Sequence, residues 1–315
     1  MIGITSSKLF STEYLIQIHT IKQKDIKVFK EQLIKYREIG FSGAIIRVFQ
    51  NRDDSYHYIS PILNKKGVYF SNNERTPTIS PIINKLTSDY NIPDFKTIVW
   101  MSTRRMDWVN GKRFGKYLIL QNKQNQKNIL SYFKSLANFK IAGILIQDDL
   151  VIKKKEENFL GVKNKKEIIL QYLQNIKKII GKKELITNIY YEVPYNSAIG
   201  DSWYGQNMDD FFNVGVDSVA IMLYQKQIQR ELKLNDTKLY QYINKIINNL
   251  KPYAEKTYIK LQITDFKTGK FIKIDRLLKI INLIPDNFKG IIFTPVRTDK
   301  FTYLYLKSLI GRIKK

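Results

Sequence analysis

The chain has 315 residues, of which 43% are hydrophobic and 13% aromatic, so it can bury a large core. No stretch reaches the ~20 apolar residues that a membrane-spanning helix needs, and no signal peptide is visible at the N-terminus. With no cysteine and two histidines, the sequence excludes disulfides, thiolate nucleophiles and metal sites built from several histidines. Nothing in it indicates a metal or a cofactor.

The net charge is +25, which makes nucleic acid or an anionic membrane surface a partner to consider. The excess is mostly lysine and is spread along the whole chain, and asparagine and isoleucine are also abundant. This pattern is more typical of a compositional bias than of one basic face. The lysine runs at 153–155 and 163–166 fall in a polar loop and are typical of solvated surface. We therefore expect no nucleic-acid partner.

Taken in chain order, short apolar runs alternate with segments of helical periodicity. The first strand is expected at 14–20, and the helix after it carries apolar residues at helical spacing up to Gly40, a typical helix stop. Together the strands are expected at 14–20, 43–49, 96–101, 143–146, 185–190, 218–223, 257–262 and 290–293. The helices are expected at 26–39, 81–90, 126–138, 166–180, 207–213, 238–253, 275–283 and 302–313. A polar insert at 50–73, with a hairpin near 65–67, separates the second strand from the second helix.

Eight strands alternating with eight helices predict an α/β fold, a single (β/α)8 TIM-like barrel formed by one domain over residues 1–315. No linker rich in Gly, Ser or Pro divides the chain. The competing fold is a doubly wound open sheet. Such sheets usually carry a glycine-rich phosphate loop after a strand, and no strand here is followed by one.

The fourth strand is the most informative stretch, because it runs directly into two acids. Gly143–Ile146 is an apolar run typical of a buried parallel strand, and Asp148 and Asp149 follow it at once. In a barrel the C-terminal strand ends carry the active site, so paired carboxylates there indicate acid chemistry. The alternative is a loop that opens with Asp-Asp only to cap a turn or helix.

Polar and aromatic side chains gather at the other expected strand ends. They include acids, amides and rings that would meet at one face: Asp107, Trp100, Trp108, Tyr190, Glu192, Trp203, Tyr204, Gln262 and Asp265. Carboxylates supply the acid and base of glycosidic cleavage, and aromatic faces pack against sugar rings. For any single ring, ordinary packing remains the alternative.

The chain resembles the C-terminal glycoside-hydrolase-like domain of bacterial poly-β-1,6-N-acetyl-D-glucosamine deacetylases of the PgaB type. Short segments carry the resemblance in order along nearly the whole chain: Val68–Asn72, Val99–Ser102 with Asp107, Gly143–Asp149, Asn188–Tyr190, Trp203–Asn207, Val219–Met222, and Leu261–Gln262 with Asp265. Each segment is weak alone, and their order makes the match specific. The family's metal-dependent deacetylase half, with its histidine-rich site, has no counterpart in this sequence.

The resemblance implies an endo-glycosidase that cleaves partially deacetylated poly-β-1,6-N-acetylglucosamine, a biofilm exopolysaccharide, in the periplasm or at the cell surface, beside an export machinery. Asp149 would be the general acid and Asp148 its charge or hydrogen-bond partner, since adjacent carboxylates push their pKa values apart. Asp107, Gln262 and Asp265 would position the sugar, and Trp203 and Tyr204 would stack on it. The base or nucleophile stays unassigned, so retaining and inverting chemistry both remain open.

The sequence departs from the family at three strand ends, which keeps a second hypothesis open. Gln147 replaces a histidine, Lys260 stands where a glutamate is expected, and Val296 and Arg297 replace two aspartates. The alternative is therefore an inactive polysaccharide-binding module of the same fold. A cationic polymer also calls for lysines on the outer helices and a negative barrel mouth, whereas Lys260 and Arg297 pointing into the mouth would favour an anionic ligand.

Overall fold

The structure, a computed structural model, describes most of the chain from Thr12 to Lys314. The described residues are 12–20, 26–47, 92–101, 106–107, 112–113, 126–127, 130, 133–134, 136–146, 150–154, 157 and 163–314. For residues 19, 20, 26, 106, 107, 112 and 113 only the backbone is described.

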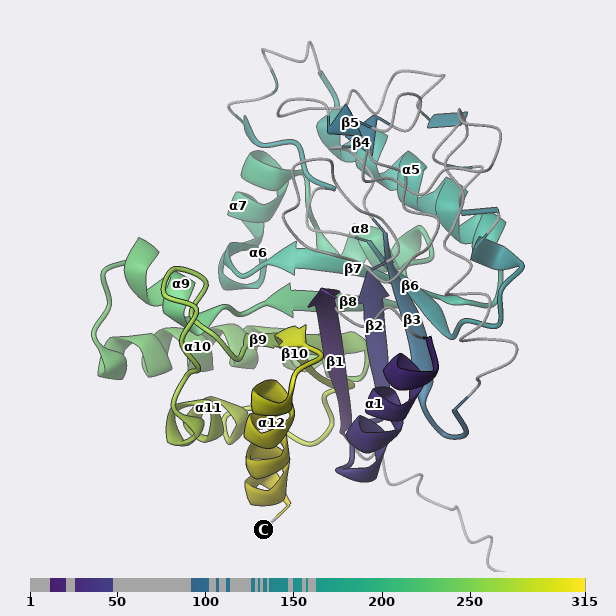
Figure 1. Ribbon diagram of the computed structural model, residues 1–315. Helices are drawn as coiled ribbons and strands as arrows, with labels where there is room; N and C mark the ends of the chain where they lie inside the picture. The colour runs from purple at the N-terminus through teal and green to yellow at the C-terminus, as the bar shows by residue number, and fades with distance from the viewer. Residues whose placement is uncertain are drawn as a thin grey trace, which may run out of the picture.

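Eight parallel strands close into a barrel, as the sequence predicts (Figure 1). Around the barrel the strands follow the order β1-β10-β9-β8-β7-β6-β3-β2. Their bounds are β1 Glu13–Thr20, β2 Gly43–Arg47, β3 Lys96–Met101, β6 Gly143–Ile146, β7 Glu184–Tyr190, β8 Ser218–Met222, β9 Thr257–Gln262 and β10 Gly290–Arg297. A separate two-stranded ribbon joins β4 (Met106–Asp107) to β5 (Lys112–Arg113). The open-sheet alternative is therefore excluded.

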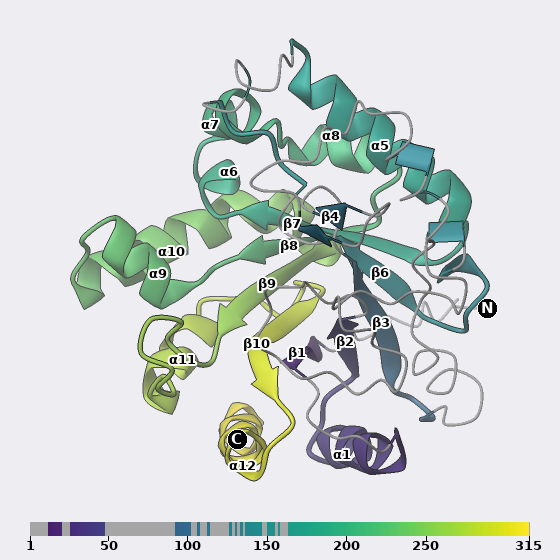
Figure 2. The same ribbon diagram turned by 45° about the horizontal axis from the view of Figure 1, so that its top comes forward.

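Helices lie outside the ring of strands (Figure 2). Their bounds are α1 Ile26–Glu38, α5 Lys165–Ile180, α6 Glu192–Tyr195, α7 Ser197–Ile199, α8 Met208–Asn213, α9 Gln225–Glu231, α10 Asp236–Leu250, α11 Ile274–Ile281 and α12 Lys300–Ile313, with a π-helix η1 at Gly200–Tyr204 and a 3-10 turn η2 at Lys251–Lys256. The longer helices bury one apolar stripe against the strands, as in α10, where Leu239, Ile243, Ile246 and Leu250 face the core. No helix in the described part of the chain is long and apolar enough to cross a membrane.

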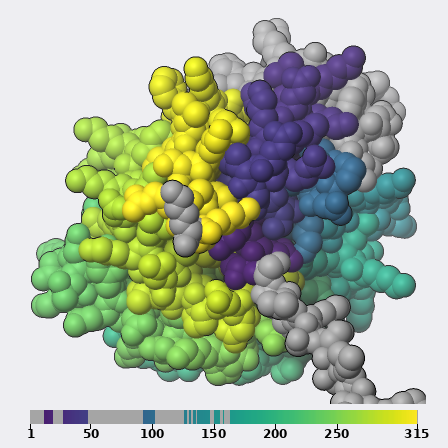
Figure 3. All heavy atoms as spheres, turned by 90° about the horizontal axis from the view of Figure 1, so that it is seen from below, coloured from purple at the N-terminus to yellow at the C-terminus, as the bar shows by residue number. Residues whose placement is uncertain are grey.

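The first and last elements close the ring. Strand β1 pairs with β10 on one side and with β2 on the other, so the first and last segments of the chain lie side by side (Figure 3). Tyr36 on α1 donates from its hydroxyl to the Arg297 carbonyl at 3.3 Å and packs edge-on against Tyr303 of α12. Burial and the nearby Asp299 carboxylate raise the pKa of Tyr36, which keeps this donor protonated.

The end of the barrel at which the strands begin has small residues at one level. By register, Gly43, Gly143, Ser218 and Gly290 occupy inward positions of alternate strands. A Cβ on any of the three glycines would approach a neighbouring strand's carbonyl oxygen to between 2.3 and 2.7 Å. Gly143, the first residue of β6, therefore does more than mark the start of a strand, because it allows close backbone approach.

The expected elements agree with the structure at the strands and the long helices. The predicted bounds 96–101, 143–146 and 257–262 are those observed, whereas β10 runs four residues beyond the expected 293. Four short elements were not expected from the sequence, α6, α7, η1 and α9, because each is too short to show a periodic pattern. The expected helix 81–90 and the hairpin near 65–67 lie outside the described residues, and 126–138 is described only in part, with helical residues at 126–127, 130, 133–134 and 136–137.

Candidate functional site at the barrel mouth

The candidate site is the end of the barrel at which the parallel strands terminate, here called the mouth. Short elements that follow β7 and β8 lie along one side of it, namely α6, α7, η1 and α9, and Figure 1 shows α6, α7 and α9 beside the ends of these two strands. Because all eight strands are parallel, their C-terminal ends meet at this one face. Its described part is built from two halves, a layer inside the barrel and a wall after β7.

Inside the barrel, one complete layer of side chains is polar or amphipathic. The strands of an eight-stranded barrel are tilted, so residues at the same level are not direct partners in the strand register. With this tilt taken into account, the register puts four inward residues of alternate strands at one level: Gln17, Trp100, Asn188 and Lys260. We call these four residues the polar layer. All of them are at most 5% exposed. Barrel interiors are usually filled with Val, Ile and Leu, so a buried layer of two amides, an indole and an ammonium requires an explanation.

Contacts across the barrel hold the polar layer together. The Lys260 ammonium donates to Asn188 Oδ1 at 3.2 Å and lies 6.0 Å from the centre of the Trp100 ring. Among the described residues, Asn188 Nδ2 and both amide atoms of Gln17 have no hydrogen-bond partner. Buried polar atoms without partners cost folding free energy, of the order of 1–3 kcal/mol each, so natural proteins usually keep them for a ligand or an ordered water.

Arg47 and an aromatic pair border the polar layer toward the mouth. The guanidinium of Arg47, buried at the end of β2, lies 5.3 Å from the centre of the Trp100 ring. Tyr224, which follows β8, places its ring 5.9 Å from the Lys260 ammonium and packs edge-on against Phe266 at 5.2 Å. Phe266 is 45% exposed, so it extends this aromatic rim to the surface.

The wall after β7 is organised by two stacked tyrosines. The rings of Tyr190 and Tyr204 lie parallel, 4.5 Å apart and 3° from coplanar, and the Lys153 ammonium lies 5.5 Å from the Tyr190 ring. The Tyr204 hydroxyl donates to Glu192 Oε1 at 3.0 Å. The stack thus ties the end of β7 to the loop after it and positions a carboxyl group beside it.

Glu192 is the described carboxyl group in this wall with the least access to water. Burial raises its pKa above the usual glutamate value, and only part of that effect is offset by hydrogen bonds from its own backbone and from Tyr204. Its Oε2 is buried and has no hydrogen-bond partner among the described residues. The neighbouring Tyr191 hydroxyl donates to Glu231 Oε2 at 2.9 Å, so a second carboxylate lies close by.

The π-helix η1 presents the most exposed tryptophan of the described residues. Trp203 is 55% exposed, while Tyr204, next to it, is buried. Single π-turns are uncommon and often occur at functional sites, because the widened turn redirects side chains. The helix ends at Gly205, whose φ of +67° is a left-handed conformation that favours glycine.

Two residues after η1 anchor the loop to the barrel. Gln206, 1% exposed, donates from Nε2 to the Asn188 carbonyl at 3.1 Å and accepts from the Tyr190 amide at 3.2 Å. Asn207 caps α8 by accepting from the Asp210 amide at 3.2 Å and donates to Asp201 at 3.2 Å. The segment Trp203–Asn207 therefore combines one exposed ring with residues that fix its position.

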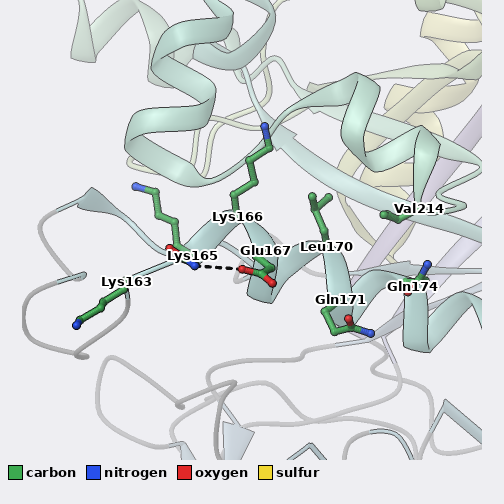
Figure 4. A pocket seen from close by; sticks show the side chains of 9 residues that line it. Lys163, Lys165, Lys166, Glu167, Leu170, Gln171, Gln174 and Val214 are labelled. Carbon is green, nitrogen blue, oxygen red and sulfur yellow. Dashed lines mark hydrogen bonds between the residues drawn. The ribbon is translucent and has the colours of Figure 1, made fainter.

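A cavity of about 570 Å³ lies behind this loop, at the start of α5 (Figure 4). It is a polar hollow lined by Lys163, Lys166, Gln171 and Gln174 among others, outside the barrel. The buried Lys165 donates to the Ser202 carbonyl and pairs with Glu157 at 2.9 Å. Lys166 pairs with Asp201 and Asp210. These lysines thus support η1 from behind.

Gln262 and Asp265, expected to position a sugar, both make protein contacts. Gln262 is fully buried, and its Oε1 accepts from the Lys226 and Gln227 amides at the start of α9, at 2.9 and 3.2 Å. Asp265 pairs with Arg230 at 2.7 Å and accepts from the Lys267 amide. These hydrogen bonds hold the pKa of Asp265 below its usual value, although partial burial opposes them. Their contact with a sugar stays a prediction.

The expected acid pair and some of its neighbours fall outside the described residues: Gln147, Asp148, Asp149 and Trp108, together with the side chain of Asp107. Flanking residues are described. Strand β6 ends at Ile146, and the Ile152 amide donates to the Tyr204 carbonyl at 3.3 Å. Trp100, expected to bind substrate, is described and belongs to the polar layer. No three His, Asp or Glu side chains form a metal-ligand group within the described part of the chain.

The charges in the mouth are mixed rather than uniformly negative. Lys260 does point into the barrel and Arg47 borders it, while Arg297 at the end of β10 is exposed. The wall after β7 contributes the carboxylates of Glu192 and Glu231.

Sequence reasoning did not select Gln17, Arg47 or Glu231, and it selected Asn188 and Glu192 only as parts of a motif and a strand end. A usable signal was present. Each of the strands 14–20, 185–190 and 257–262 carries an amide or a lysine side chain beside apolar neighbours, and a buried parallel strand is normally apolar throughout. What the sequence does not show is that these residues share a level in the barrel.

No protein-family profile matches the sequence, and no curated protein sequence matches it significantly. Solved structures do match. The PgaB (BpsB) glycoside hydrolase domain from Bordetella bronchiseptica superposes with a TM-score of 0.65 at 13% identity, over 95% of this chain and 99% of that one. An endo-1,4-β-mannanase from Rhizomucor miehei gives 0.60 at 11% identity, over 97% and 96%. A GH18 chitinase from Pseudoalteromonas aurantia gives 0.54 at 11% identity, over 95% and 99%.

At these identities the likeness establishes the fold alone, a barrel that this chain shares with the three glycoside hydrolases. The expected resemblance to the PgaB glycoside hydrolase domain is confirmed at the level of structure, over almost the whole chain. A barrel of this kind can host many chemistries, so substrate and mechanism must be argued from the mouth.

Proposed function

We propose that the protein is a glycoside hydrolase that cleaves partially deacetylated poly-β-1,6-N-acetylglucosamine at the barrel mouth. The observation that carries the proposal is the wall after β7, in which an exposed Trp203, a stacked tyrosine pair and the half-buried carboxyl group of Glu192 stand together at the strand ends. An exposed ring for a sugar face and carboxyl groups in low-dielectric surroundings are what glycosidic cleavage uses. The structural likeness to the PgaB domain supports the choice of polymer.

In this proposal Asp149 is the general acid and Asp148 its partner. The chain on both sides of the pair supports that placement, since β6 ends at Ile146 and Ile152 lies against Tyr204. The acid would protonate the glycosidic oxygen, and an adjacent carboxylate would keep its proton in place near neutral pH. The family resemblance also suggests a periplasmic or cell-surface location beside an exopolysaccharide export machinery.

One observation favours a second candidate, a polysaccharide-binding module without activity. Lys260, which stands where the family resemblance leads one to expect a glutamate, is buried inside the barrel and donates to Asn188. A lysine there supplies neither a base nor a nucleophile for glycosidic cleavage in its protonated form.

Product analysis after incubation with the partially deacetylated polymer separates the two candidates. A hydrolase releases short oligosaccharides, and Asp149→Asn abolishes most of that release while binding of the polymer persists. If wild type and Asp149→Asn bind the polymer equally and neither shortens it, the protein is a binding module and the hydrolase proposal is refuted. Binding of neither polymer nor its oligomers refutes both candidates.

A further inference from the structure

We infer that the polar layer is the base of a sugar subsite that selects an N-acetylated unit over a unit with a free amine. The inference rests on the proposed function, since it places a sugar in the mouth. It adds the residues that choose between the two kinds of unit in the polymer. Gln17, Asn188 and Lys260 carry it.

The orientation of Asn188 follows from its neighbour. A protonated lysine has only donors, so the Asn188 side chain must present Oδ1 to the Lys260 ammonium, 3.2 Å away. Its Nδ2 is thereby left as a donor, and no described residue accepts from it. The Asn188 backbone is held as well, because Gln206 donates to its carbonyl at 3.1 Å. The layer therefore offers a fixed donor that requires an acceptor.

Gln17 adds a second, more versatile group at the same level. It is fully buried on β1, and neither Nε2 nor Oε1 has a hydrogen-bond partner among the described residues. It can therefore donate to one ligand atom and accept from another. Together the two side chains offer two donor atoms, Asn188 Nδ2 and Gln17 Nε2, and one acceptor atom, Gln17 Oε1. In a low-dielectric interior it is costly to leave such atoms without a hydrogen bond.

An acetamido group matches this set, and an ammonium group does not. The acetyl carbonyl can accept from Asn188 Nδ2, the amide N–H can donate to Gln17 Oε1, and the methyl group can pack on the Trp100 ring of the same layer. A free amine is protonated at neutral pH and has only donors, so it would leave the Asn188 donor unsatisfied. It would also bring a second positive charge close to Lys260 in a low-dielectric interior. A carboxylate on the sugar would satisfy the donors but offers nothing to Gln17 Oε1.

Selection of this kind should be strong. Sites built to hydrogen-bond a group reject analogues that lack it by factors of about 10⁴–10⁵, whereas apolar pockets discriminate by roughly 10–200-fold. With one mismatched hydrogen bond and one charge repulsion, we expect the acetylated ligand to bind at least about tenfold more tightly.

The test compares three β-1,6-linked glucosamine tetramers by calorimetry: fully N-acetylated, fully deacetylated, and N-succinylated, which keeps the amide of the acetylated unit but ends each acyl chain in a carboxylate. The informative variant is Asn188→Asp, which keeps the size of the side chain and its contact with Lys260 but replaces the donor with an acceptor. The matched control is Thr187→Val, at the position directly before Asn188 on β7. Because side chains alternate along a strand, Thr187 faces the helices, and its buried hydroxyl also lacks a described partner.

Wild type and Thr187→Val should bind the acetylated tetramer at least about tenfold more tightly than the deacetylated one. Asn188→Asp should reduce that ratio about tenfold, because its carboxylate accepts from an ammonium. Thermal melts establish that each variant is folded, and Gln17→Glu serves as the second variant if Asn188→Asp is not. Equal binding of the acetylated and deacetylated tetramers, an unchanged ratio in a folded Asn188→Asp protein, tightest binding of the succinylated tetramer, or binding of none of them overturns the inference.

Hydrolysis of the partially deacetylated polymer, measured in parallel, keeps the two proposals separate. Hydrolysis without a preference among the tetramers refutes the subsite and leaves the hydrolase standing. A preference that Asn188→Asp removes, in a protein that cuts nothing, supports the subsite in a binding module.

Discussion

Replacing Trp203 with alanine tests whether the π-helix η1 presents a sugar-binding platform. The side chain is 55% exposed, so its truncation removes little packing and the protein should unfold at nearly the wild-type temperature. The backbone contacts that shape the loop do not depend on the indole, since the Gly205 amide donates to the Asp201 carbonyl and the Gln206 amide to the Gly200 carbonyl. A loss of binding would therefore report on the ring itself.

The size of the loss follows from the exposed area. A tryptophan side chain can bury roughly 200 Å², so an exposure of 55% leaves about 110 Å² for a ligand. A sugar that packs on one of the two faces covers about half of this, and ~25 cal/mol per Å² then gives about 1.4 kcal/mol. We expect Trp203→Ala to weaken polymer binding about tenfold, while Trp203→Phe, which keeps an aromatic face, should lose only a part of this.

Calorimetric titration of wild type, Trp203→Ala and Trp203→Phe with N-acetylated β-1,6-linked oligomers measures these differences, and melting curves establish that the variants are folded. Wild-type affinity in a folded Trp203→Ala protein would show that the exposed indole does not contact the polymer. A drop of many degrees in melting temperature would show that the ring supports the fold instead, contrary to its exposure.

Three further perturbations test the acid, the wall and the barrel. Asp149→Asn should reduce hydrolysis by roughly 10²–10⁴-fold with little effect on binding, since a positioned proton donor is worth that much; full activity would remove Asp149 from this role. The pKa of Glu192 is raised in the folded protein, so folding favours its protonated form. The stability that this form contributes is fully present below the unfolded-state pKa and is lost as pH rises through the folded-state pKa. Glu192→Gln should therefore gain stability relative to wild type as pH rises, which urea unfolding at pH 4 and pH 7 measures, and a constant difference would contradict the assignment. Gly143→Ala should destabilise the protein by about 1–3 kcal/mol, because the added Cβ would lie 2.7 Å from the Glu184 carbonyl oxygen, whereas Gly311→Ala on α12, with open space around it, is the control.

The sequence by itself determined the architecture. Strands such as Gly143–Ile146 and Ser218–Met222 are recognisable because a parallel strand covered on both faces is a short apolar run between breaks. The crossovers through the helices between such strands are almost always right-handed. Eight repeats of that unit close into a barrel, and the polar residues at the strand ends then locate the mouth. Tyr190, Trp203 and Tyr204 could be chosen as site candidates for this reason.

Only the tertiary structure decided which residues meet. The polar layer joins residues of β1, β3, β7 and β9, and its level is set by the tilt and register of the closed barrel, which no local pattern encodes. The same holds for Gln262, whose place after a strand suggested a sugar contact but whose side chain binds the start of α9. Local spacing specifies which face of an element a side chain occupies. Whether that side chain meets a helix terminus, another side chain or a ligand depends on residues far away in the chain, which come together only when the barrel closes.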